Sequence, residues 1–312
     1  MKHLFIVNPV AGGKDRHEYV AEQARLALEG SADAYEVYIT TAPMDACAKI
    51  KAEAASGEEL RVYACGGDGT LNECVNGAVG HDNVAVTHFP CGTGNDFIKM
   101  FGEEKDRFFD LSDLVRGEVR PLDVMECCGR YAVNICSVGI DARIGTSVHN
   151  YSKIPVIGGA TGYVVSLIVN VLKGINRHMR VRIKDFYVDE ELALVCVCNG
   201  RYYGGGFNPS LTARPDDGVL DVFVVKKVGL ITLARMLGKY ASGHADECPQ
   251  YITRIQTDEV SISFDEDNVI NIDGEAVFSK DVNIHVIHNA VKLIVPAGMK
   301  FFEQSAAAAA AV

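Results

Sequence analysis

Apolar and polar positions follow two alternating periods over the first hundred residues. Short apolar runs predict strands over residues 4–7, 35–39, 60–65 and 84–89. Between them, apolar residues at helical spacing predict helices over 16–28, 46–55 and 71–79, and a further helix that begins at Phe97. Strands that alternate with helices over short connections form a parallel sheet covered on both faces. We therefore predict a doubly wound α/β domain over residues 1–122.

Beyond Asp123 the pattern changes to closely spaced strands with few helical interruptions. These predicted strands cover residues 124–128, 131–138, 179–184, 192–198, 219–225, 260–264, 269–272, 282–287 and 291–295. Such a series favours an antiparallel β-sandwich or a flattened barrel over residues 123–295. Residues 296–305 could return to the first domain. The overall prediction is an α/β domain followed by an all-β domain.

Two segments stand apart from this pattern. Residues 160–175 form an apolar helix candidate that is shorter than the roughly 20 residues needed to span a bilayer. Packing against the sheet is the simpler interpretation, and a wall of an acyl-chain pocket or a contact with a bilayer interface is the alternative. The alanine-rich tail, residues 306–312, is left out of the fold prediction.

Composition narrows the classes of partner. The 312 residues are 48% hydrophobic and carry a formal net charge of −11. An acidic chain lacks the basic stripe that a nucleic acid requires, so we expect no nucleic-acid partner and only local, mainly apolar membrane contact. The start of the chain shows no leader pattern, which favours a cytoplasmic protein that associates with membranes transiently. A homodimer is possible, although nothing in the sequence marks an interface.

Three glycine-containing loops follow predicted strands at residues 8–14, 66–70 and 92–96. The second reads Gly-Gly-Asp-Gly-Thr between a strand and a helix. Glycine lets the backbone approach a ligand closely, and a helix N-terminus attracts anions, so this loop suits phosphate, while Asp68 could hold a metal. A tight strand-to-helix turn is the alternative. Because ligands bind beyond the carboxyl ends of parallel strands, the three loops can converge on one site.

The order of these motifs is more specific than any one of them. Residues 8–14 read Asn-Pro-Val-Ala-Gly-Gly-Lys, residues 66–73 Gly-Gly-Asp-Gly-Thr-Leu-Asn-Glu, and residues 92–97 Gly-Thr-Gly-Asn-Asp-Phe. Asp-Asp-Gly-Val-Leu-Asp follows at 216–221 and Ile-Asp-Gly-Glu at 272–275. This set resembles the diacylglycerol kinase catalytic family, which includes bacterial lipid kinases and is related to sphingosine and ceramide kinases. Gly-Gly-Asp-Gly alone is shared with NAD kinases.

The resemblance implies a role for each motif. ATP would lie in a crevice between the domains, with Asp273 as the base that removes the lipid hydroxyl proton and Glu275 nearby. Asp68 would lie close to the Mg²⁺ that bridges the phosphates. The nucleotide-binding positions that it implies are Asn8, Pro9, Gly12, Thr40, Gly66, Gly67, Asp68, Gly69, Thr70, Glu73, Thr93 and Asn95. Taken by itself, Asp273-Gly274 is typical of a hairpin turn.

A second, structural Mg²⁺ site is implied at residues 214–219. There the Asp217 carboxylate would act together with the main-chain carbonyls of Arg214 and Val219, although an Asp- and Gly-rich turn explains the same residues. The predicted function is an ATP-dependent lipid kinase, with diacylglycerol converted to phosphatidic acid as the first choice. A phosphotransferase similar to NAD kinase that acts on a soluble substrate, or a regulator without catalytic activity, remains an alternative.

Overall fold

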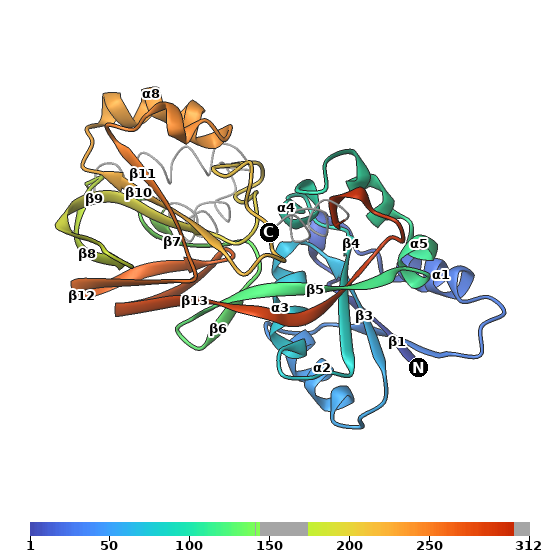
Figure 1. Cartoon of the computed structure of the whole chain (residues 1–312). Coiled ribbons are helices and arrows are strands. Elements are labelled where there is room, and N and C mark those ends of the chain that lie inside the picture. The colour runs from blue at the N-terminus through green and yellow to red at the C-terminus, as the bar shows by residue number, and fades with distance from the viewer. Residues whose placement is uncertain (141, 144–173, 303–312) are drawn as a thin grey trace, which may run out of the picture. The chain divides into compact units, whose positions relative to one another are not determined.

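The chain folds into two compact units (Figure 1). The computed structural model describes residues 1–140, 142–143 and 174–302, so residues 160–173 of the predicted 160–175 helix and the 306–312 tail lie outside the described residues. Unit 1 comprises Met1–Val124 and the described residues from His288 on, and unit 2 comprises Met125–Ile287. The chain passes between them within two strands, β5 (Glu118–Cys127) and β13 (Glu275–Val295).

The return to unit 1 begins earlier along the chain than residue 296. Strand β13 continues through the break predicted between residues 287 and 291. Its Lys292 and Leu293 pair in parallel with Ala85 and Val86 of β4 (Val84–Pro90). The end of β13 therefore supplies a strand to the sheet of unit 1.

Unit 1 is built on the predicted parallel sheet, with strand order β2-β1-β3-β4-β13. Its first three strands are β1 (Lys2–Val7), β2 (Ala34–Ile39) and β3 (Leu60–Gly66). Val7 lies opposite both Ile39 and Cys65, and Gly66 lies opposite Pro90, so the carboxyl ends of the strands are aligned. The loops that follow β1, β3 and β4 consequently leave the sheet at the same edge.

Helices connect and cover these strands. They are α1 (His17–Ala27), α2 (Asp45–Ala54), α3 (Asp68–Ala78), α4 (Asp96–Lys99) and α5 (Leu111–Val115), with short 3₁₀ helices η1 (Ala11–Gly13) and η2 (Gly102–Phe109). Helices α2 and α3 pack so closely that a Cβ at Gly77 would lie only 2.9 Å from the Ile50 Cβ. The close packing fixes α3, which carries the Asp-Gly-Thr part of the Gly-Gly-Asp-Gly-Thr motif, against its neighbour.

Unit 2 is formed mainly by antiparallel strands in the order β11-β10-β9-β7-β12-β13. Strand β8 pairs with β9 and β12, and β6 pairs with β5. The bounds of these strands are β6 (Arg130–Ala132), β7 (Ile135–Gly139), β8 (Arg177–Ile183), β9 (Phe186–Cys198), β10 (Leu220–Lys226), β11 (Ile252–Thr257) and β12 (Glu259–Ile272). This combination of a parallel α/β unit with an antiparallel β unit confirms the predicted fold class.

Strand lengths in unit 2 differ from the predictions. The runs 260–264 and 269–272 belong to the single strand β12, whereas 131–138 is divided into β6 and β7. The polar residues 265–268 separate the two apolar runs in the sequence, and a register irregularity in the β12–β13 pairing accommodates them without ending the strand.

Both faces of the central strands of unit 2 are buried. Along β9, Val195 and Val197 belong to one apolar cluster, whereas Cys196 and Cys198 belong to another. The second cluster also receives Met236 and Tyr240 from helix α8 (Leu230–Ala241), which is followed by η3 (Ala245–Glu247). Because alternate residues of a strand point to opposite faces, β9 joins two cores.

Candidate functional site

A cavity of about 280 Å³ lies in unit 1, beyond the carboxyl ends of β1 and β2 and beside the first turns of α3. It is lined by Asn8, Pro9, Val10, Thr40, Thr41, Ala42, Pro43, Thr70 and Glu73. Five of these nine residues belong to the predicted nucleotide-binding set: Asn8, Pro9, Thr40, Thr70 and Glu73. The structure thus brings together residues that are up to 65 positions apart in the sequence, at the edge of the sheet where a ligand was expected.

Asn8 links the loop after β1 to helix α3. Its backbone N–H donates to the Cys65 carbonyl at 3.2 Å, and its side-chain Nδ2 donates to Thr70 Oγ1 at 3.3 Å. Its Oδ1 accepts the Val10 N–H at 3.1 Å, which turns the chain immediately after the strand. Asn8 therefore sets the position of one wall of the cavity and of the Thr70 hydroxyl.

The opposite wall is fixed through Asp45, the first residue of α2. Its Oδ2 accepts the Thr41 N–H at 2.7 Å, and its Oδ1 accepts the Tyr38 hydroxyl at 2.9 Å. These bonds stabilise the charged carboxylate, so the Thr41 N–H and then the Tyr38 hydroxyl lower the pKa of Asp45. The Thr40 N–H in turn donates to the Val7 carbonyl at 2.9 Å. The polar edge of the cavity is thereby anchored to both strands.

The glycine-containing loops pack against one another at backbone distance. A Cβ at Gly12 would lie 2.4 Å from the Cys91 carbonyl oxygen, and a Cβ at Gly92 would lie 2.5 Å from the Gly67 Cα. The Gly66 carbonyl accepts the N–H groups of Cys91 at 2.8 Å and of Gly92 at 3.1 Å. Gly12, Gly66 and Gly67 therefore join the three loops, a role that was not predicted for them.

Helix α3 begins three residues earlier than predicted. Gly67 is its N-cap, so Asp68, Gly69 and Thr70 form the first turn of the helix rather than a separate loop. The first N–H groups of a helix have no acceptor within it, and they carry the positive end of its dipole. This turn can therefore receive an anionic group at the cavity.

Asp68 is engaged within the protein. Its Oδ1 accepts the Asp96 N–H at 2.6 Å and the Phe97 N–H at 3.3 Å, which caps the short helix α4. Of the other predicted positions in this loop, Thr93 is exposed. Asn95 has a φ of 49° and donates from Nδ2 to the Gly92 carbonyl at 2.9 Å. The Asp68 carboxylate thus connects the β3–α3 turn to the 92–96 loop.

His88 is a supporting residue that the sequence analysis missed. It is fully buried on β4, and its Nε2 lies 3.1 Å from the Gly66 carbonyl oxygen. Burial lowers the pKa of His88, so the ring is neutral at physiological pH and Nε2–H can donate to that carbonyl. A titratable residue within a mainly apolar strand was the available signal.

In unit 2, Asp273 lies in the two-residue turn between β12 and β13. Asp273 has a φ of 48° and Gly274 a φ of 100°, while Ile272 pairs with Glu275 across the turn. Positive φ at both central residues is typical of a type I′ hairpin turn. The turn interpretation of this motif is therefore correct, and Glu275 is exposed at the start of β13.

The Asp273 carboxylate is bound by the chain between β6 and β7. Its Oδ2 accepts the Val133 N–H at 2.6 Å, and its Oδ1 accepts the N–H groups of Asn134 at 3.0 Å and Ile135 at 2.9 Å. The Asp273 N–H donates back to the Ile135 carbonyl at 3.0 Å. These bonds fix the orientation of the carboxylate and stabilise its negative charge.

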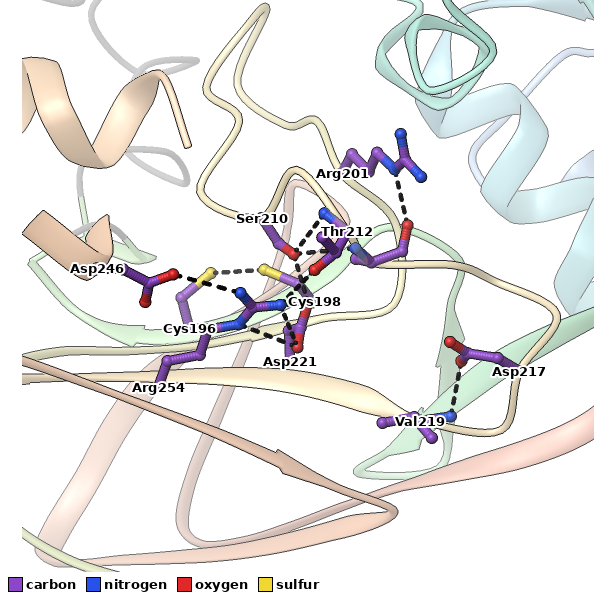
Figure 2. A network of polar contacts seen from close by, with 11 residues as sticks. Cys196, Cys198, Arg201, Ser210, Thr212, Asp217, Val219, Asp221, Asp246 and Arg254 are labelled. Atoms are coloured by element: carbon purple, nitrogen blue, oxygen red, sulfur yellow. Dashed lines mark hydrogen bonds and ion pairs between the residues drawn. The ribbon is translucent and has the colours of Figure 1, made fainter. Parts of the chain in front are cut away.

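The predicted structural metal site is an Asx turn in the structure (Figure 2). Asp217 Oδ1 accepts the Val219 N–H at 3.0 Å. The Arg214 side chain pairs with Asp216 at 2.9 Å. Within the described ranges, no three His, Cys, Asp or Glu side chains gather around a common point that could hold an ion. The exposed Asp217 carboxylate could therefore contribute to an Mg²⁺ site only together with backbone carbonyls and water.

A buried ionic network near this turn is a second feature that the sequence analysis missed. Asp221 is 2% exposed and receives the Arg254 guanidinium at 2.9 Å and the Ser210 hydroxyl (Figure 2). Arg254 also donates to Thr212. The network ties the 210–213 segment to β10 and β11, which is a structural role.

Two domain families match consecutive parts of the chain. The family described as "Diacylglycerol kinase catalytic domain" matches residues 2–127, and the one described as "YegS C-terminal NAD kinase beta sandwich-like domain" matches residues 134–295. Two Staphylococcus aureus proteins whose names read "Putative lipid kinase", from strains MRSA252 and JH9, are 28% and 27% identical over 249 residues. In both cases the match covers 80% of this chain and 81% of the relative.

Solved structures give the same fold. A crystal structure of a diacylglycerol kinase from Bacillus anthracis str. Sterne has a TM-score of 0.70 at 23% identity, covering 96% of this chain and 98% of that one. A second structure from the same organism, described as a "putative diacylglycerol kinase", has a TM-score of 0.74 at 24% identity with 96% coverage of both chains. At these identities the likeness concerns the fold.

Gly12→Ala tests whether the cavity depends on loop packing, and Gly13→Ala is its matched control. Both glycines have positive φ, 65° and 69°, but only a Cβ at Gly12 meets backbone, whereas a Cβ at Gly13 has no atom within 4 Å. We expect Gly12→Ala to weaken ATP binding about tenfold or more and Gly13→Ala to change it little, as measured by titration calorimetry. Equal losses in the two variants would contradict the packing argument.

Asp217→Ala tests the metal site. If Asp217 holds Mg²⁺, the metal should stabilise the wild type and raise its melting temperature. At a hundredfold excess of Mg²⁺ over Kd, the free energy of unfolding should increase by about 2.7 kcal/mol. The variant should show no such increase. Asp185→Ala, in the exposed β8–β9 turn of the same unit, should respond to Mg²⁺ like the wild type. A wild type that does not respond would exclude the site.

Proposed function

We propose that this chain, which belongs to the family that joins a diacylglycerol kinase catalytic domain to a YegS C-terminal NAD kinase beta sandwich-like domain, uses ATP to phosphorylate a lipid hydroxyl. Diacylglycerol, converted to phosphatidic acid, is the acceptor that we favour. The observation that carries the proposal is the cavity of unit 1, which gathers Asn8 and Thr40 from two loops and Thr70 and Glu73 from helix α3, all within the catalytic-domain match.

The cavity suits the phosphates of a nucleotide. The Thr40 and Thr70 hydroxyls and the Asn8 amide are hydrogen-bonding groups for phosphate oxygens. The first turn of α3 adds N–H groups and the positive end of a helix dipole. Among the nine lining residues there is no Lys or Arg, and Glu73 is acidic. A triphosphate would therefore need a bound cation to balance its charge.

Mg²⁺ is the cation that fits this requirement. When bound, it would neutralise charge that develops on the transferred phosphoryl group. Asp68 and Glu73 supply the hard oxygen ligands that Mg²⁺ prefers, directly or through water. Asp68 already accepts two N–H groups through Oδ1, so its role in metal binding would be added to its capping role.

The reaction is an in-line displacement at the γ-phosphorus. The lipid hydroxyl oxygen forms a new bond to phosphorus, the bond to the β,γ-bridging oxygen of ATP breaks, and ADP leaves with that electron pair. The hydroxyl proton passes to the Asp273 carboxylate. Three N–H donors hold this carboxylate in one orientation. Phosphoryl transfer depends mainly on positioning and charge stabilisation, so a carboxylate held in place suits this reaction.

A soluble acceptor is the second candidate. The "NAD kinase beta sandwich-like" description of the C-terminal match and the Gly-Gly-Asp-Gly-Thr turn both allow it. A panel that contains diacylglycerol, phosphatidylglycerol, a sphingoid base and ceramide in mixed micelles, together with NAD, separates the two when γ-labelled ATP and Mg²⁺ are supplied. Label in a lipid supports the proposal, and label only in NAD overturns it.

Asp273→Asn tests the proton acceptor. We expect turnover to fall about 10²- to 10⁴-fold with ATP affinity nearly unchanged, because the cavity of unit 1 is built without Asp273. An Asn side chain would turn an NH₂ group towards the N–H groups of residues 133–135, so some loss of stability should accompany the kinetic effect. Glu275→Gln, at an exposed position two residues further along the chain, is the matched control, and we expect it to reduce turnover less. An equal loss of ATP affinity in Asp273→Asn would contradict the assigned role.

Two substitutions at Asp68 separate its possible roles. Asp68→Asn keeps an Oδ1 that can accept the Asp96 N–H, whereas Asp68→Ala removes the cap and should cost about 1 kcal/mol of stability. If the charge contributes to metal binding, both variants should need at least tenfold more Mg²⁺ for half-maximal phosphorylation. An Asp68→Asn enzyme with the Mg²⁺ dependence of the wild type would leave Asp68 with a capping role alone.

A further inference from the structure

Helix α8 (Leu230–Ala241) is attached to unit 2 by one side (Figure 1). Met236 and Tyr240 are buried in an apolar cluster, and Leu233 packs against it. The Tyr240 ring contacts Phe223 of β10 edge to face, with the ring centroids 6.2 Å apart. These contacts fix the rotation of the helix about its axis and thereby decide which residues face outward.

The outward side of α8 is apolar. Leu230 is 54% exposed, Ile231 70% and Leu237 37%. Residues 230, 234 and 237 follow the helical spacing i, i+4, i+7, so Ala234 completes one stripe with Ile231 beside it. We call these four residues, Leu230, Ile231, Ala234 and Leu237, the outer stripe. Burial of such side chains against a partner would be favourable, and within unit 2 they remain exposed.

A fifth apolar side chain lies just beyond the end of the helix. Leu211 is 49% exposed, and a Cβ at Gly243, two residues after α8, would lie 2.3 Å from its Cγ. Leu211 therefore covers the backbone next to the C-terminal end of α8. An exposed apolar side chain is therefore present in the adjoining loop as well as on the helix.

The charges on this helix are all positive. Its sequence, LITLARMLGKYA, contains Arg235 and Lys239 and no acidic residue, in a chain of net charge −11. Lys226 and Lys227 precede it. Lys227 pairs with Glu191 and Lys239 with Glu247, both at exposed positions, and in the described parts of the chain no carboxylate lies within 4 Å of Arg235. The outer stripe is thus accompanied by cations.

We propose that α8 docks unit 2 on a phospholipid bilayer that contains anionic lipid. The outer stripe would enter the boundary between headgroups and acyl chains, and Arg235 and Lys239 would contact phosphate groups. An apolar helix face flanked by Lys and Arg is the pattern of helices that lie in a membrane interface. This inference rests on the proposed function, because a lipid kinase must meet its substrate at such a surface.

A second copy of the chain fits α8 less well than a bilayer. In a two-fold symmetric dimer the helix would pack on its own copy, so Arg235 would approach a surface that carries the same positive charges. An anionic lipid surface has the opposite charge. The overall charge of −11 does not prevent such docking, because at physiological ionic strength charges farther away than about 8 Å are largely screened.

Vesicle flotation tests the proposal with the full chain. We expect the wild type to bind phosphatidylcholine vesicles that contain phosphatidylglycerol, and Leu230→Gln with Ile231→Gln to weaken binding about tenfold or more. Loss of one cation near an anionic surface is expected to weaken binding roughly fivefold, and Arg235→Glu should weaken vesicle binding by more than that. Leu26→Gln, at a 45% exposed leucine on helix α1 of unit 1, is the matched control and should bind like the wild type.

Four outcomes would overturn the docking site. In vesicle flotation, these are a wild type that does not bind, a double variant that binds as tightly as the wild type, and a control that loses as much binding as the double variant. In light scattering, the fourth is a wild type that is a dimer and a double variant that is a monomer. The substituted side chains are exposed, so melting temperatures should remain near that of the wild type.

Activity on a dispersed substrate separates this inference from the proposed function. With a short-chain diacylglycerol that is soluble as a monomer, the α8 double variant should phosphorylate at the wild-type rate and lose activity only on vesicles. If the wild type phosphorylates no lipid while the double variant still loses vesicle binding, the proposed function fails and the docking site stands. Normal lipid phosphorylation on vesicles by a double variant would reject the docking site alone.

Discussion

The cavity of unit 1 depends on the close backbone contact of three loops at the carboxyl edge of the parallel sheet. A Cβ on Gly12 would overlap the Cys91 carbonyl oxygen, and a Cβ on Gly92 would overlap the Gly67 Cα. The Gly66 carbonyl joins this contact by accepting the N–H groups of Cys91 and Gly92. Because these loops position Asn8 and the first turn of α3, the shape of the cavity follows from the absence of Cβ atoms a few residues away. His88 supports the same carbonyl from within the sheet.

The two carboxylates to which we assign chemical roles also hold the backbone in place. Asp68 accepts the first N–H groups of α4, and Asp273 accepts three N–H groups of the β6–β7 connection. A carboxylate fixed in this way loses little entropy when it meets a substrate, and its negative charge stays in a defined place. Carboxylates fixed in this way suit a reaction in which orientation contributes more than proton abstraction, as in phosphoryl transfer.

Local sequence patterns were sufficient for the sheet of unit 1 but for only part of the cavity. The strands were short apolar runs, and the rule that ligands bind beyond their carboxyl ends predicted that the loops of Asn8 and Thr70 converge, whereas Thr40 was implied only by the family resemblance. The start of α3 was predicted too late because glycine is rare inside helices, yet Gly69 lies in the first turn, where exposed N–H groups are useful. Long-range contacts were beyond such patterns. The neighbouring residues in the sequence indicate neither the Asp221–Arg254 ion pair nor the three N–H groups that donate to Asp273.

ATP and the anionic bilayer, the two proposed binding partners, carry negative charge, and the chain itself carries a net charge of −11. Screening limits electrostatic interaction to short range, so the local arrangement of charge decides whether each ligand can bind. At the cavity, backbone N–H groups and a helix dipole act beside Glu73, so a metal ion is needed for a triphosphate. On α8 the side chains themselves are cationic, and apolar residues supply the remaining attraction. An acidic surface elsewhere would oppose broad adsorption to anionic membranes, so in the docking that we propose α8 would determine how unit 2 meets a bilayer.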